Sequence, residues 1–128
     1  MSTYKHLIVW QKSIILAKNI YTLSQTFPKA ETFGLASQMQ RAAVSIASNI
    51  AEGNGRASRN EYVHFLSIAR GSCFELDTQL TICREIGYKS SKELEESFSL
   101  LQEIGRILNA MIRSLSTNKE EKPLTTKN

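Results

Sequence analysis

The sequence is poor in the residues that build metal centres, disulfides and membrane spans. Its 128 residues include only two cysteines, Cys73 and Cys83, and two histidines, His6 and His64. The cysteines form neither a CxxC pair nor a zinc-binding spacing, and neither histidine has a carboxylate or thiol neighbour at metal-binding spacing. No apolar run approaches the ~18 residues of a membrane span, and no basic-then-apolar leader opens the chain. We therefore expect no metal, no cofactor, no membrane segment and a reducing, cytoplasmic location.

A catalytic constellation is also missing, since the sequence shows no nucleophile–base pair. The glycine-containing stretch GNGRAS, residues 53–58, differs from phosphate-binding loops. It lacks the third glycine of GxGxxG and the Gly-Lys-Ser/Thr of a P-loop, and it follows a helical pattern rather than a strand. We expect it to end a helix, with Gly53 or Gly55 taking a positive φ. The protein is therefore expected not to be an enzyme.

Charge is distributed unevenly along the chain. Residues 1–70 carry eight Lys/Arg against three Glu, whereas residues 71–128 carry eight Lys/Arg against nine Asp/Glu. The net charge of +4 thus arises entirely in the first half. Such an excess is compatible with a polyanionic partner and equally with an ordinary solvated surface.

Four helical segments are predicted, and no alternating strand pattern interrupts them. Capping boxes at Ser58–Glu61 and Ser90–Glu93 mark the starts of the third and fourth helices, and Gly87 is a suitable left-handed residue at the end of the third. The expected helices span residues 5–26, 33–53, 59–86 and 91–116. Short connections favour antiparallel neighbours. We predict an all-α, up-down-up-down four-helix bundle over residues 1–116 and a disordered polar tail over residues 117–128.

The third predicted helix has the most regular core pattern. Its apolar residues repeat at alternating steps of four and three, as in a heptad seam: Tyr62, Leu66, Ala69, Cys73, Leu76, Leu80 and Cys83. Both cysteines lie on this seam, so we expect them to be buried as small apolar side chains.

The second predicted helix combines a large apolar arc with a neighbouring row of alanines. The alanine row, which would let another helix approach closely, consists of Ala36, Ala43, Ala47 and Ala51.

The first and fourth predicted helices carry more apolar surface than a monomeric bundle requires. The first has one stripe through Leu7, Trp10, Ile14, Ala17 and Tyr21 and a second through Val9, Leu16, Ile20, Leu23 and Phe27. The fourth is similarly broad, with Leu94, Phe98, Leu101, Ile104, Leu108, Met111, Ile112 and Leu115. Because so wide an apolar face needs neighbours on two sides, we expect a homo-oligomer, with Leu16, Ile20, Leu23 and Phe27 as its candidate interface.

Four stretches of the chain are similar to the four-helix-bundle proteins encoded in intervening sequences of bacterial 23S ribosomal RNA genes. They are VWQKSIILAKNIY (residues 9–21), FPKAETFGLASQMQRAAVSIASNIAEGNGRAS (27–58), FLSIARGSCFEL (65–76) and EIGRILNAMIRSL (103–115). The resemblance implies an antiparallel bundle that assembles into a ring, commonly a homopentamer. A related branch resembles the accessory protein of diversity-generating retroelements, a basic ring that binds nucleic acid and a reverse transcriptase.

The characteristic polar positions of this family are Asn49, Glu52, Arg70 and Glu75. We expect Asn49 and Glu52 to bond across helices or subunits, with Arg41 or Arg70 as partners, and to set the packing register.

Two functions remain open at this point: a sequence-indifferent RNA- or DNA-binding accessory ring, and a protein-interaction scaffold with no nucleic-acid role. No RNA-recognition aromatics or helix-turn-helix pattern is present, so contacts to phosphates are expected. The candidate phosphate-binding residues are Lys12, Lys18, Arg41, Arg56 and Arg59.

Overall fold

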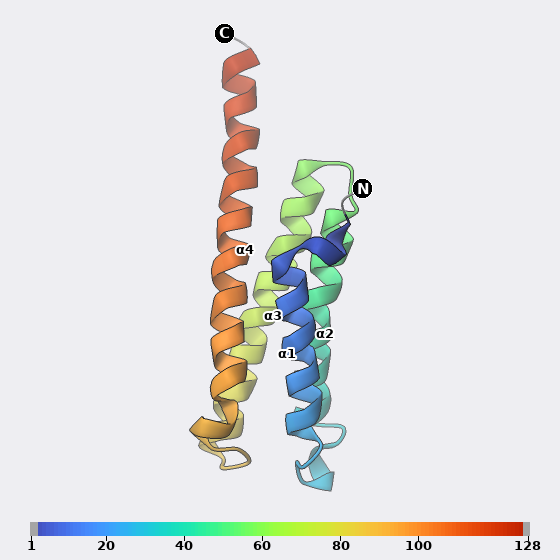
Figure 1. Ribbon diagram of the computed structural model, residues 1–128, viewed down its shortest axis with the longest axis vertical. Coiled ribbons are helices and arrows are strands. Elements are labelled where there is room, and N and C mark those ends of the chain that lie inside the picture. The colour runs from blue at the N-terminus through green and yellow to red at the C-terminus, as the bar shows by residue number, and fades with distance from the viewer. Residues whose placement is uncertain (1–2, 127–128) are drawn as a thin grey trace.

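The protein is a bundle of four α-helices, as the computed structural model shows for the backbone of residues 3–126 and the side chains of residues 3–117 (Figure 1). The helices are α1 (Ile8–Ser24), α2 (Leu35–Asn54), α3 (Arg59–Glu85) and α4 (Ser91–Thr126), with 3-10 turns at Tyr4–His6 and Lys29–Glu31. The chain runs down through α1, up through α2, down through α3 and up through α4 (Figure 1). Helices α1 and α3 each pack against both α2 and α4. Helix α1 therefore lies diagonal to α3, and α2 lies diagonal to α4. The predicted all-α fold is confirmed.

Local signals define the helix ends. The Ser90 hydroxyl accepts a hydrogen bond from Glu93 N at 3.1 Å, and the Glu93 carboxylate accepts one from Ser90 N at 2.8 Å, which completes the predicted capping box. This bond from the Ser90 amide lowers the pKa of Glu93. Gly87 takes a φ of 83°, and Tyr88 N donates to Cys83 O at 3.0 Å, which closes α3 in a Schellman motif.

One predicted backbone conformation and one predicted helix end are wrong. Helix α2 ends at Asn54, within one residue of the prediction, and Gly55 caps it with a φ of −82°. Among the described residues a positive φ occurs at Gly87, so the positive φ expected at Gly53 or Gly55 is not found. Helix α4 ends at Thr126 rather than near 116, and its last turns extend beyond the other three helices (Figure 1). The lysines and glutamates at 119–122 favour helix, and extending an existing helix avoids the cost of nucleation. Pro123, by contrast, disfavours helix in the last turn. Residues 127–128 of the predicted tail lie outside the described chain.

The core follows the predicted seam of α3. Leu66, Ala69, Leu76 and Leu80 are fully buried, and Tyr62 is half-buried. Cys73 and Cys83 are buried free thiols, as predicted, and burial raises the pKa of Cys73 to about 12. A thiol with so high a pKa has almost no thiolate at neutral pH, so it serves packing.

The predicted oligomer interface on α1 is wrong, because its residues form the core of the subunit itself. Leu16 and Ile20 are 0% exposed, Phe27 is buried and Leu23 is half-buried against the core. The exposed apolar residues of α1 are instead Ile8, Ile14, Ile15 and Tyr21. Two of them, Ile14 and Tyr21, belong to the other predicted stripe, which also contains Leu7, Trp10 and Ala17.

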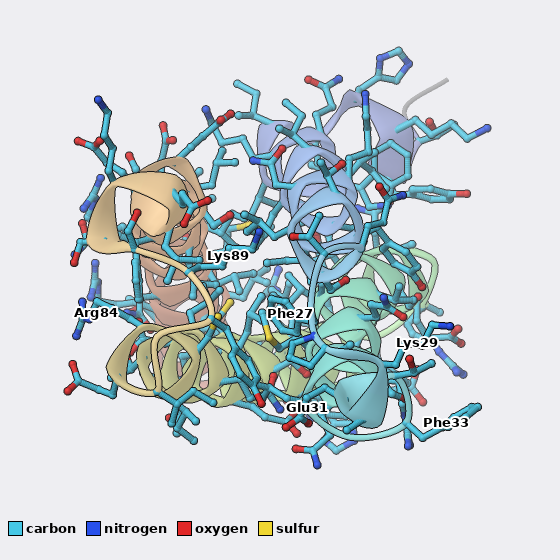
Figure 2. All side chains as sticks on the ribbon, turned by 90° about the horizontal axis from the view of Figure 1, so that it is seen from below. Phe27, Lys29, Glu31, Phe33, Arg84 and Lys89 are labelled. Carbon is cyan, nitrogen blue, oxygen red and sulfur yellow. The ribbon has the colours of Figure 1, made fainter. Side chains whose placement is uncertain are left out.

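The end of the bundle where α1 turns into α2 is closed by Glu31. Its carboxylate accepts one hydrogen bond from Leu35 N at the start of α2 and another from the Tyr88 hydroxyl, both at 2.9 Å. These bonds lower the pKa of Glu31. Phe27 points into the bundle beside Tyr88, with the ring centroids 5.4 Å apart, whereas Phe33 points away from it (Figure 2).

Candidate nucleic-acid interface

The junction between α2 and α3 carries two of the candidate cations in different electrostatic settings. Arg56 forms an ion pair with Glu52, one turn earlier, and its guanidinium lies 4.9 Å from the centroid of the Phe65 ring. Arg59 is the first residue of α3 and is exposed. It has no carboxylate within 4 Å in the described part of the chain. Arg59 therefore presents a full charge, while Glu52 offsets that of Arg56.

The two lysines of α1 also differ. Lys12 Nζ lies 3.1 Å from a Glu103 carboxylate oxygen, and this pair joins α1 to α4. Lys18 is exposed, and the ion pairs among residues 3–117 do not include it. Of the two, Lys18 is the better candidate for a phosphate contact, since the Lys12 charge is already compensated.

Arg41 lies on the exposed side of α2. It lines a hollow of about 310 Å³ between α2 and α3, together with Gln38, Ser45 and Glu75. Arg41 and Glu75 form no ion pair within 4 Å. The hollow thus contains one charge of each sign, with Arg41 accessible to an anion from solvent.

The family's characteristic polar residues do not converge on one site. Asn49 Nδ2 donates to the Ser45 carbonyl at 2.8 Å and to the Ser45 hydroxyl at 3.0 Å, and this hydroxyl bonds to that of Ser72 on α3 at 2.8 Å. Asn49 therefore reaches the neighbouring helix through a serine rather than through an arginine. Within the subunit the predicted partners are wrong, because Glu52 pairs with Arg56 and Arg70 bonds to Asn109 on α4. A bond between subunits stays a prediction.

A groove between α3 and α4 was missed by the sequence reasoning. Its volume is about 430 Å³, and its lining includes Arg70, Phe74, Asp77, Leu101, Gly105 and Arg106. Arg70 Nη1 donates to the Asn109 side-chain oxygen at 3.1 Å across the groove. Two sequence signals could have indicated it: Phe74 lies off the apolar seam of α3, and Gly105 interrupts a run of good helix formers.

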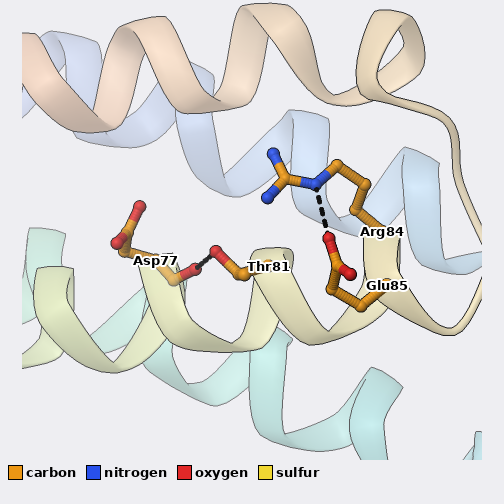
Figure 3. A network of polar contacts seen from close by, with 4 residues as sticks. All are labelled: Asp77, Thr81, Arg84 and Glu85. Atoms are coloured by element: carbon orange, nitrogen blue, oxygen red, sulfur yellow. Dashed lines mark hydrogen bonds and ion pairs between the residues drawn. The ribbon is translucent and has the colours of Figure 1, made fainter.

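Another cation on α3, Arg84, has its charge compensated by Glu85. Asp77 and Arg84 both extend from α3 on the side of α4 (Figure 3). Arg84 Nε lies 3.4 Å from the Glu85 carboxylate, and its guanidinium lies 5.6 Å from the centroid of the Phe98 ring on α4. Neither Arg70 nor Arg106 forms an ion pair with a described residue. Among residues 3–117, Arg70 and Arg106 are therefore cations without a carboxylate within 4 Å that line the groove.

Comparison with known proteins connects this arrangement to a family. The sequence pattern of the 23S rRNA-intervening sequence proteins matches residues 5–110. The chain belongs to this family. The resemblance noted from the sequence is thereby confirmed.

The bundle is also similar to a protein whose crystal structure is known. That protein, of unknown function, comes from the S23 ribosomal protein family of Bacteroides thetaiotaomicron. It is 25% identical in sequence and superposes with a TM-score of 0.74 over 82% of this chain and 98% of that chain. No curated protein matches the sequence.

The matched range, residues 5–110, includes every candidate cation and all the groove residues named above. Within the described part of the chain, no cluster of three His, Cys, Asp or Glu side chains could hold a metal ion. None of the described helices combines the length and apolar character needed to cross a bilayer.

Proposed function

We propose that this 23S rRNA-intervening sequence protein is a non-catalytic homo-oligomer that binds RNA or DNA through phosphates, without reading base sequence. The observation that supports this function is the set of uncompensated surface cations, Lys18, Arg41 and Arg59, which have no carboxylate within 4 Å among the described residues. Cations free of acidic partners attract polyanions and release the counterions that phosphates hold.

An oligomer would multiply these few charges. One subunit offers too few contacts for tight binding, whereas several copies act on one polyanion as a multivalent site. The family resemblance favours five subunits in a ring. A reverse transcriptase is the protein partner that the same resemblance suggests.

The subunit contact is proposed to use the exposed apolar residues of α1. Ile8 is 62% exposed and Ile15 is 46% exposed, and their spacing of seven places them in line on the helix surface. Ile14 and Tyr21 form a second line with the same spacing. Burial of both lines against another subunit would remove this apolar surface from water.

Binding is expected to weaken steeply with salt, by roughly 0.7–0.9 log units per tenfold rise in salt for each phosphate neutralised. Replacing Arg41 and Arg59 with alanine should lower both the affinity for a labelled oligonucleotide and the slope of log affinity against log salt. Fluorescence anisotropy at several salt concentrations measures both quantities.

Lys18→Gln and Lys12→Gln form a matched pair on one helix. Lys12→Gln should lower the affinity less, because Lys12 is already paired with Glu103. Equal effects of the two lysine variants would contradict the assignment.

Assembly is expected to depend on the exposed face of α1. Replacing Ile8 and Ile15 with glutamate should dissociate the oligomer while the circular dichroism stays that of a helical protein, since neither side chain is buried in the subunit. Light scattering should give a mass near five subunits of 14.4 kDa for the unmodified protein and one subunit for the variant. A monodisperse unmodified monomer at micromolar concentration would refute the assembly.

A protein-interaction scaffold is the second candidate function. It is favoured by Phe33, which is 94% exposed and points away from the bundle (Figure 2). If the assembled protein binds neither single-stranded nor double-stranded nucleic acid at about 50 mM salt, where electrostatic binding is strong, the scaffold function replaces the first.

A further inference from the structure

The groove between α3 and α4 has features that a simple phosphate-binding surface does not need. A volume of about 430 Å³ falls within the range of small-ligand sites, roughly 300–1,000 Å³. Its walls combine apolar groups, Phe74, Leu101 and the bare backbone at Gly105, with the polar ends of Arg70 and Arg106. An apolar wall with a few convergent polar groups is typical of a site that holds a small organic group.

Phe74 is the aromatic element of this groove. Its side chain is 66% exposed although it lies in the middle of a 27-residue helix. The ring pairs and cation–π contacts of the described residues all involve other aromatic rings. An exposed phenyl ring beside a cationic groove is the kind of platform on which unpaired bases stack.

Charge at the groove favours an anionic chain. Arg70 and Arg106 line it from opposite helices, against a single carboxylate, that of Asp77. The bond from Arg70 to Asn109 holds the guanidinium in place and leaves its other N–H groups for a further acceptor. Gln102 adds a side-chain amide that can donate and accept. A phosphate suits the two arginines, while Asp77 and the amides suit the polar edge of a base.

We propose that the α3/α4 groove receives one unpaired base of a single-stranded nucleic acid, stacked on Phe74, with the adjoining phosphate held by Arg70 and Arg106. The assignment rests on the proposed nucleic-acid function and adds the strand type to it. Bases of a duplex are paired and stacked on one another, so they reach such a groove only if the duplex opens.

Gly105 provides a way to close the groove without disturbing the core. A Cβ built at Gly105 meets no atom within 4 Å, so Gly105→Leu would project into open space in the groove. A matched control exists at Gly71 on α3, where an added Cβ likewise meets nothing within 4 Å but which does not line the groove. Both changes also replace a mid-helix glycine with a better helix former, so neither is expected to unfold the bundle.

The experiment compares Phe74→Ala, Gly105→Leu and Gly71→Leu with the unmodified protein on three labelled probes of equal length. The probes are a single strand, the same strand with abasic sites, and its duplex. Phe74→Ala should weaken single-strand binding roughly 5- to 150-fold, as expected for the loss of one stacked base. Gly105→Leu should weaken it similarly, and Gly71→Leu should not. The affinities of the variants for the abasic strand and the duplex should stay within about twofold of the unmodified protein, as expected where the changed residue and the probe do not interact.

Two results would overturn the inference while leaving the proposed function intact. One is unchanged single-strand affinity in both Phe74→Ala and Gly105→Leu, and the other is an equal loss on the single strand, the abasic strand and the duplex. Failure of the unmodified protein to bind any of the three probes would overturn the inference together with the proposed function.

Discussion

Replacing Leu16 and Ile20 together with glutamate is expected to unfold the subunit rather than to separate subunits. Both side chains are 0% exposed inside the bundle. Each buried carboxylate without a partner costs several kcal/mol, while the whole free energy of unfolding of such a domain is about 5–15 kcal/mol. Far-ultraviolet circular dichroism should show loss of helix at neutral pH, and the cooperative thermal transition should disappear.

The matched control for this experiment is the Ile8→Glu, Ile15→Glu variant on the same helix. It makes the same chemical change at positions that are 62% and 46% exposed, so it should keep its helices and a cooperative transition. If the Leu16 and Ile20 variant instead remained helical and merely became monomeric, those residues would belong to an interface. Their assignment to the core of the subunit would then be wrong.

Gly53→Ala is expected to lower the free energy of unfolding by roughly 1–3 kcal/mol, the usual cost of overpacking. Helix propensity alone predicts the opposite sign, since alanine is favoured over glycine in a helix by about 1 kcal/mol. Packing decides, because a Cβ at Gly53 would lie 2.8 Å from Phe65 Cβ and 3.3 Å from the Tyr62 carbonyl oxygen on α3. These atoms are part of the α3 backbone or attached to it, so a side-chain rotation cannot relieve the contact. Urea denaturation gives the change in unfolding free energy.

Gly71→Ala is the control for the effect of propensity. An added Cβ there meets nothing within 4 Å, so this variant should be more stable than the unmodified protein by about 1 kcal/mol. Opposite signs for the two glycine variants are the expected result. A Gly53→Ala protein as stable as the Gly71→Ala protein would show that α2 and α3 can separate slightly at no cost.

The sequence by itself determined the elements of this protein. Four helices, the capping box at Ser90 and Glu93, the left-handed Gly87 and the buried seam of α3 all follow from interactions within a few residues along the chain. Capping and 3.6-residue periodicity depend on such neighbours, so they can be recognised without knowing where the other helices lie. The family was also recognisable from the sequence.

Only the tertiary structure decided which face of α1 is buried. Two apolar stripes on one helix satisfy the same periodicity, so a helical wheel cannot tell whether Leu16 or Ile14 points inward. The positions of α2 and α4 make the choice, and they bury Leu16 while leaving Ile14 at the surface. Gly53 is a similar case, since its role depends on the approach of Phe65 from another helix rather than on its own backbone.

The candidate interface depended on the tertiary structure even more strongly. Whether a lysine or arginine carries an available charge depends on a carboxylate that can be far away in sequence, as Glu103 is from Lys12. The groove likewise forms between two helices, with Arg70 and Phe74 of α3 on one side and Gly105 and Arg106 of α4 on the other. Charge counts and periodicity describe one segment at a time, whereas ion pairs and grooves form between segments that only the folded chain brings together.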